Sequence, residues 1–113
     1  MGVHILRRAA TSRQLAEMLQ DGEDEVRLAV DLQRGVVAGG GEFHADCEEA
    51  LLDDGSRADD VWGATWRPAS GELCLCALIN IKPEQGNRTV EVQEGTARSR
   101  IEALVRKTLG CER

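Results

Sequence analysis

The stretch "EVRLAVDLQRGVVA", residues 25–38, decides the fold. Its first eight residues alternate, and one face collects the apolar side chains Val26, Leu28, Val30 and Leu32. Alternation with a period of two is typical of a strand that buries one face. The turn "QRG" then leads into a second apolar run, "VVA", so the stretch predicts a β-hairpin and with it an antiparallel sheet.

Apolar patterns on either side of this hairpin supply the other elements. Further strands are predicted over residues 3–6, 60–66, 72–81 and 88–92. Helices are predicted from Thr11, over 43–53 and over 96–109. The run 72–81 is apolar on both faces, as a central strand should be. We therefore expect an α+β fold, with one domain over residues 1–113, a mainly antiparallel sheet of five or six strands, and about three helices packed on one face.

Composition limits the classes of partner. The chain has 113 residues and a net charge of −6, and its only aromatic residues are Phe43, Trp62 and Trp66. An acidic chain without clustered basic residues does not bind duplex nucleic acid well, and so few rings offer no stacking surface for single strands. No apolar run is long enough to span a bilayer, and "MGVHILRRAATS" does not read as a signal peptide. We expect no nucleic-acid partner, no membrane partner and a cytoplasmic location.

The chain contains four cysteines: Cys47, Cys74, Cys76 and Cys111. In a cytosolic protein they are expected to be reduced thiols. Their spacing matches neither the C-x-x-C redox motif nor the paired cysteines of a zinc site. If Cys74 and Cys76 lie in a strand, both point to one face, where burial as small apolar side chains is the usual role. No cofactor and no metal site are expected from this pattern.

The stretch "GGGEFHADCEEALLDDG", residues 39–55, holds the catalytic candidates His44, Cys47 and Glu48. A helix from residue 43 has a buried stripe at Phe43, Cys47, Ala50 and Leu51, and His44 and Glu48 lie four residues apart on its flank. A helix start at Asp46, with Asp46-x-x-Glu49 as a capping box, is the alternative and would leave His44 on the glycine-rich loop. The earlier start is preferred. The glycines do not make a phosphate-binding loop, because the required Lys and Ser or Thr are absent.

A second polar group lies in "INIKPEQGNR", residues 79–88. Its ligand-binding candidates are Asn80, Lys82, Asn87 and Arg88. If 79–81 pairs with 88–92, these amides and the guanidinium converge, and Arg suits a small anionic ligand. The alternative is that Asn87 is a turn residue and Arg88 forms an outer salt bridge. Asn80 falls in an otherwise apolar strand, so its amide requires a buried partner.

The blocks "VVAGGGEFHADCEEALLDDGS", "DDVWGATW" and "INIKPEQGNR" resemble those of a family of small bacterial proteins, common in cyanobacteria, whose function is unknown. The resemblance extends from about "VHIL" to the last helix. It implies one stand-alone cytosolic domain and carries no activity, cofactor or catalytic residue with it.

Two classes of function fit these patterns. The leading hypothesis is a non-catalytic binding or interaction module that acts as a homo-oligomer or with a protein partner. The rival is a small hydrolase-like enzyme in which Glu48 orients His44 as general base and Cys47 is the nucleophile. In that enzyme, Arg88 and Asn80 would bind an anionic group. A third hypothesis, a metal bound by His44 and Glu48, needs ligands from elsewhere in the chain.

Overall fold

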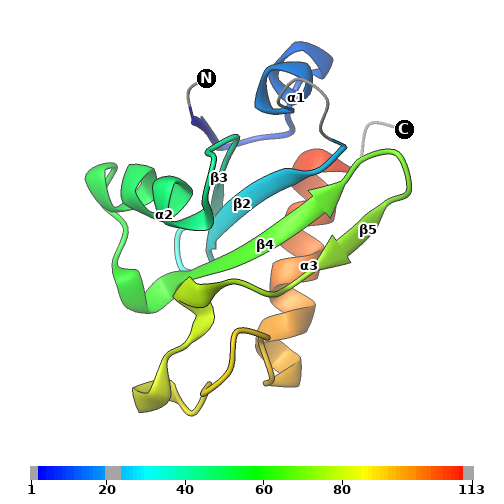
Figure 1. Ribbon diagram of the computed structural model, residues 1–113. Helices are drawn as coiled ribbons and strands as arrows, with labels where there is room; N and C mark the ends of the chain where they lie inside the picture. Colours follow the sequence, from blue (N-terminus) through cyan, green and yellow to red (C-terminus); the bar gives the residue numbers. More distant parts are fainter. Residues whose placement is uncertain (1–2, 20–23, 111–113) are drawn as a thin grey trace.

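A computed structural model describes residues 3–19 and 24–110, so Cys111 lies outside the described residues. The five strands are β1 (His4–Leu6), β2 (Val26–Asp31), β3 (Val36–Gly39), β4 (Val61–Arg67) and β5 (Glu72–Cys74). They form one antiparallel sheet in the order β1-β3-β2-β4-β5 (Figure 1). The helices are α1 (Ser12–Met18), α2 (His44–Asp53) and α3 (Gly95–Leu109). The predicted α+β class is confirmed.

The hairpin of β2 and β3 forms as the sequence predicts. The Asp31 carboxylate accepts hydrogen bonds from the backbone N–H groups of Gln33 and Arg34 at 2.8 and 2.9 Å. Gly35 has a φ of +71°, a conformation that favours glycine. The turn residues therefore fix the register that pairs Val30 with Val37.

The helices do not share one face of the sheet, which corrects the prediction. The side chains of α1 and α3 pack on the face of Leu28, Val30 and Trp66. Those of α2 pack on the opposite face against Ala29 and Ala38, and Figure 1 shows α2 and α3 on either side of the sheet. The cause lies in the second face of the sheet, where Ala29 of β2, Val36 and Ala38 of β3 and Val61 of β4 form an apolar patch. This face therefore requires a cover as well.

The predicted central strand over 72–81 is instead a short strand at the sheet edge. Only Glu72–Cys74 pairs with β4. Residues 75–77 then leave β4 and bond to the segment 90–92: the Ala77 N–H donates to the Val90 carbonyl and the Val92 N–H to the Leu75 carbonyl, both at 3.0 Å. The predicted strand over 88–92 is reduced to these bonds and one bridge, so the sheet has five strands.

Asn80 completes the edge of β4 where β5 departs. It ends a 3-10 turn, Leu78–Asn80, and its carboxamide is fully buried. The side-chain oxygen accepts the Gly63 N–H at 2.7 Å, and the side-chain nitrogen donates to the Gly63 carbonyl at 3.1 Å and the Val90 carbonyl at 3.0 Å. The buried partner that the sequence requires for Asn80 is therefore the backbone of β4 itself.

Gly63 allows this close approach. A Cβ at this position would lie 2.6 Å from the Ala77 Cβ and 3.1 Å from the nearest Ile79 side-chain carbon. Real Cβ atoms do not come that close to another carbon, so a side chain on Gly63 would push the crossing segment away. The pairing of Asn80 with β4 thus depends on a glycine in the middle of a strand.

We predict that Asn80→Ala lowers the free energy of unfolding by about 3 kcal/mol, because the buried N–H and C=O of Gly63 both lose their partner. Urea denaturation followed by circular dichroism measures this change. The matched control is Arg88→Ala in the same segment, an exposed position that should change the stability by less than about 0.5 kcal/mol. Equal effects of the two variants would contradict this role of Asn80.

Candidate functional site

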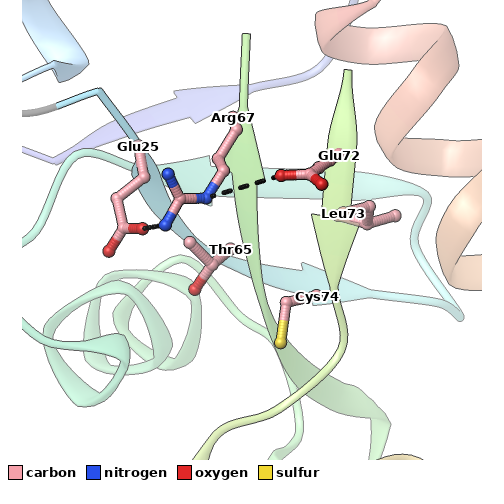
Figure 2. A pocket seen from close by; sticks show the side chains of 6 residues that line it. All are labelled: Glu25, Thr65, Arg67, Glu72, Leu73 and Cys74. Atoms are coloured by element: carbon pink, nitrogen blue, oxygen red, sulfur yellow. Dashed lines mark ion pairs between the residues drawn. The ribbon is translucent and has the colours of Figure 1, made fainter. Parts of the chain in front are cut away.

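Helix α2 covers only part of its face of the sheet. The residues beneath it are small or apolar, and they include Ala29, Ala38 and Val61. Beyond the N-terminus of α2, the same face becomes polar and opens into a pocket of about 520 Å³. We call this the open-end pocket. Its lining residues are Glu25, Thr65, Arg67, Glu72, Leu73 and Cys74 (Figure 2).

His44 is the first residue of α2 and connects the helix to this pocket. The helix begins there, as preferred from the sequence, and the Phe43 N–H donates to the Asp46 carboxylate at 3.1 Å. Contrary to the predicted stripe, Phe43 is 62% exposed, because it precedes the helix. The His44 Nε2 lies 3.0 Å from both the Ala64 carbonyl oxygen and the Thr65 hydroxyl. The helix N-terminus is thereby held against β4.

These contacts define the protonation of His44. A carbonyl oxygen only accepts, so the bond to Ala64 places a proton on Nε2. Burial lowers the pKa of the ring below its ordinary value, outweighing the Ala64 hydrogen bond, which acts in the other direction. The ring is therefore neutral at neutral pH, and Nδ1 carries a lone pair.

Glu48 does not orient this imidazole. Within the described part of the chain, no hydrogen bond or ion pair joins Glu48 to His44. The negative charge of Glu48 acts on Lys82 instead. Burial, the largest effect, lowers the pKa of Lys82, and the charge of Glu48 acts in the opposite direction. The predicted His44–Glu48 pair is thus replaced by a bond from His44 to the sheet.

Cys47 does not meet the requirements of a nucleophile. Its side chain is fully buried, and its Sγ lies 3.4 Å from the Arg27 carbonyl oxygen. Burial raises the pKa of the thiol to about 11, so the thiolate is scarce at neutral pH. The prediction of a buried stripe is confirmed for Cys47 and Leu51, and the prediction of a nucleophile is corrected by that same burial.

The amides of the second group of candidates, Asn80 and Asn87, stabilise the fold. Asn80 and Asn87 are buried. The Asn87 side-chain nitrogen donates to the carbonyls of Asn80, Thr89 and Glu91, and its oxygen accepts the Gln93 N–H. These bonds hold the loop after η3 (Pro83–Gln85) against the rest of the segment.

Lys82 is also buried, with its ammonium donating to the Ala58 and Ile79 carbonyls at 2.9 and 3.2 Å. The same group lies 5.0 Å from the centre of the Trp62 ring. Arg88, in contrast, is exposed, and no hydrogen bond or ion pair of it occurs among residues 3–19 and 24–110. An anion on Arg88 could not reach the buried Asn80 amide, so the expected joint anion site is not assembled.

Arg67 is the charged residue that the sequence reasoning missed. Its guanidinium lies 3.3 Å from the Asp24 carboxylate, 3.1 Å from Glu25 and 3.9 Å from Glu72. Figure 2 shows Glu25 and Glu72 on either side of it. Glu25 precedes β2 and Glu72 is the register partner of Arg67 on β5. A correct register between 25–32 and 60–67 would have revealed this cluster, which we call the Arg67 cluster (Arg67, Asp24, Glu25 and Glu72).

The described residues lack two kinds of feature. Among residues 3–19 and 24–110, no group of three or more His, Cys, Asp or Glu side chains could hold a metal ion. No helix in the same part of the chain is long and apolar enough to cross a membrane. The third hypothesis, in which His44 and Glu48 bind a metal, therefore lacks its further ligands among these residues.

One comparison with known proteins gives a match. A family described as "Protein of unknown function (DUF5674)" matches residues 4–108, which run from β1 to near the end of α3. No curated protein and no solved structure matches the chain. The match thus covers the hairpin, the open-end pocket and the Asn80 segment.

We predict that the stability of the protein falls as the pH drops below about 6.5, the pKa of an unperturbed His. The folded His44 has a lowered pKa, so below that pH the unfolded chain binds a proton that the folded chain does not. Urea midpoints at about pH 7.5 and about pH 5.5 measure the loss. In His44→Gln, whose amide can still donate to Ala64, the loss should be smaller. An unchanged pH dependence would contradict a neutral, buried His44.

We also predict that Cys47 resists alkylation in the native protein while Cys74 reacts. Cys74 is exposed, whereas Cys47 is buried with a pKa of about 11. Brief treatment with iodoacetamide followed by peptide mass spectrometry distinguishes the two. Labelling of Cys47 at the rate of a urea-unfolded control would restore it as a candidate nucleophile.

Proposed function

The chain belongs to the DUF5674 family of proteins of unknown function, and we propose that it is a non-catalytic binding module whose binding surface is the open-end pocket. The occupant that suits this pocket is a basic side chain of a protein partner. Three features of the pocket support this assignment: its charge, its hydrogen-bonding groups and an exposed aromatic residue beside it.

The charge of the Arg67 cluster carries the proposal. Three carboxylates surround the Arg67 guanidinium, and Glu25 also pairs with Arg27 at 3.8 Å, so the negative charges beside the pocket exceed the positive ones by one. An incoming guanidinium or ammonium group would gain carboxylate partners there, and such charge-assisted bonds are the strong ones. An anion would meet Glu25 and Glu72 first. The net charge of −6 over the whole chain acts in the same direction on approach.

Two uncharged lining residues, Thr65 and Cys74, provide hydrogen-bonding groups. Thr65 presents a hydroxyl whose position is held by the neutral His44 ring at 3.0 Å. Cys74 presents a thiol from the next strand, opposite Thr65 in register. Because these groups sit on paired strands and a helix terminus, the pocket is preorganised, which reduces the entropic cost of binding.

Phe43 supports a protein partner over a free small molecule. It directly precedes His44 and exposes 62% of its surface. Exposed aromatic side chains are enriched at the centres of protein interfaces. A partner that places a basic group in the pocket could cover Phe43 with an adjacent apolar residue.

A hydrolase-like enzyme is the second candidate, and one observation favours it. The lone pair on the His44 Nδ1 is that of a general base. The other parts of that hypothesis have no such support, because Cys47 is buried, Glu48 does not contact His44 and Asn80 is bonded to Gly63. The binding module therefore accounts for more of the surface.

The proposal predicts that cationic side-chain analogues bind the open-end pocket. Titration of ¹⁵N-labelled protein with N-acetyl-arginine amide should shift the amide resonances of Thr65, Arg67 and Cys74, and the anionic N-acetyl-glutamate amide should not. Glu72→Gln should weaken binding about two- to fivefold, since one exposed charge pair contributes at most about 1 kcal/mol.

The matched control is Glu84→Gln, which removes an exposed carboxylate from the 3-10 turn Pro83–Gln85 and should leave the affinity unchanged. The proposal fails if the anionic analogue shifts these resonances more than the cationic one. It also fails if neither analogue shifts them, or if both variants lose affinity equally.

A further inference from the structure

The edge strand β5 and the residues that follow it carry two thiols on their outward face, one exposed and one half-buried. From residue 72 to 76 the chain alternates, with Leu73 and Leu75 turned to the core and Cys74 and Cys76 turned away from it. Cys74 is exposed and Cys76 is half-buried, and neither forms a disulfide. The sequence predicted both as buried side chains in a central strand. The edge position of β5 reverses that expectation for Cys74, which is exposed although free Cys is among the most buried residue types.

The backbone on both sides of Leu75 is held in an extended conformation. Cys74 is the last residue of β5 and pairs with Thr65 on β4. Cys76 forms an antiparallel bridge with Glu91. Leu75 between them is 6% exposed, and its carbonyl accepts the Val92 N–H at 3.0 Å. The two cysteines therefore project from a fixed segment toward the same side.

This geometry disfavours a disulfide between the two thiols. Residues two apart in a strand are separated by about 6.6 Å, whereas a disulfide requires Cβ atoms about 3.5–4.5 Å apart. Closing the bond would bend the segment at Leu75 and withdraw that side chain from the core. A bridging atom between the sulfurs removes this conflict, because two metal–sulfur bonds of about 2.3 Å each span much of the gap.

We propose that Cys74 and Cys76 form a two-thiolate site for a soft monovalent metal ion, Cu(I). Soft thiolate ligands select Cu(I) among the common metal ions, and this ion accepts two sulfur ligands in a linear arrangement. Zn(II) requires about four ligands, and no third His, Cys, Asp or Glu joins these thiols in a ligand group within the described residues.

Metal binding replaces two protons at this site. The two thiol protons leave for solvent as the ion binds, and the site becomes singly negative. Beside Cys76, the Glu91 carboxylate and the Arg98 guanidinium lie 3.7 Å apart and act on the charge of Cys76 in opposite directions.

The inference does not rest on the basic occupant proposed above. Cys74 lines the open-end pocket, but Cys76 is not among the residues that line it. A Cys76 variant therefore tests the metal site, and a Glu72 variant tests the pocket.

The experiment is a competition for Cu(I) in the absence of oxygen. Fully reduced protein is added to the coloured Cu(I)–bicinchoninate complex, and the loss of absorbance measures transfer of the ion. The wild type and a Cys111→Ser variant should take up one equivalent. Cys74→Ser and Cys76→Ser should each bind about 100-fold more weakly, because one thiolate alone loses the effective concentration of the other.

The thermal midpoints of both Ser variants, measured by circular dichroism without metal, should match the wild type because neither thiol belongs to the core. A wild type that takes up no copper would overturn the inference. So would a Cys76→Ser variant that binds as tightly as the wild type, or a Cys111→Ser variant that loses the affinity.

Discussion

The bond between the Asn80 carboxamide and the backbone of Gly63 is the constraint on which the surrounding structure depends. In an antiparallel ladder, the edge of β4 would go on pairing with β5 beyond Cys74. Instead, the Asn80 side chain donates to the Gly63 carbonyl at 3.1 Å and accepts the Gly63 N–H at 2.7 Å. The backbone groups of Gly63 therefore need no partner on β5. The chain is thereby released from the sheet after Glu72–Cys74. The buried side-chain amide takes the place of a strand backbone, and this stabilises the fold because an unpaired backbone group in the core is costly.

The pairing of Asn80 with Gly63 also determines which residues lie on the surface. Because β5 is short and at the edge, Glu72 and Cys74 face solvent beside Thr65 and Arg67 rather than the interior. Helix α2 adds the second boundary. It packs on the sheet over Ala29 and Ala38 and begins at His44, whose ring bonds to the Ala64 carbonyl. The open-end pocket is the space that these two boundaries leave uncovered, and its polar lining comes from outward-facing residues of β4 and β5 and from Glu25, which precedes β2.

Local patterns in the sequence were sufficient for the hairpin, the class of fold and several element starts. Thr11 and Gln14 form a capping box with bonds of 3.1 and 3.0 Å, and α3 ends at Leu109 with Gly110 as its C-cap. These features depend on neighbours within a few residues. The position of 72–81 in the sheet depended on Gly63, which is distant in sequence, and apolar periodicity does not distinguish a central strand from a buried segment that crosses one. For the same reason the pattern of 25–32 did not show that a helix would cover its second face.

The candidate site was predictable only in part. His44 was found from its residue type, but its partner on β4 required a register that the sequence does not specify. The candidates in "INIKPEQGNR" were correctly seen as an unusual polar group, yet their amides bond to the backbone of this chain. Arg67 was missed and Cys74 was expected to be buried, because the surroundings of both residues depend on which strand lies beside them.

Hydrogen exchange at the Gly63 amide tests the role of Asn80 most directly. If the carboxamide completes the edge of β4, the Gly63 N–H exchanges with deuterium only when the whole domain unfolds, together with the slowest amides of β2 and β4. Exchange of Gly63 as fast as the amides of the exposed turn at 84–86, while its neighbours in β4 stay protected, would contradict the account.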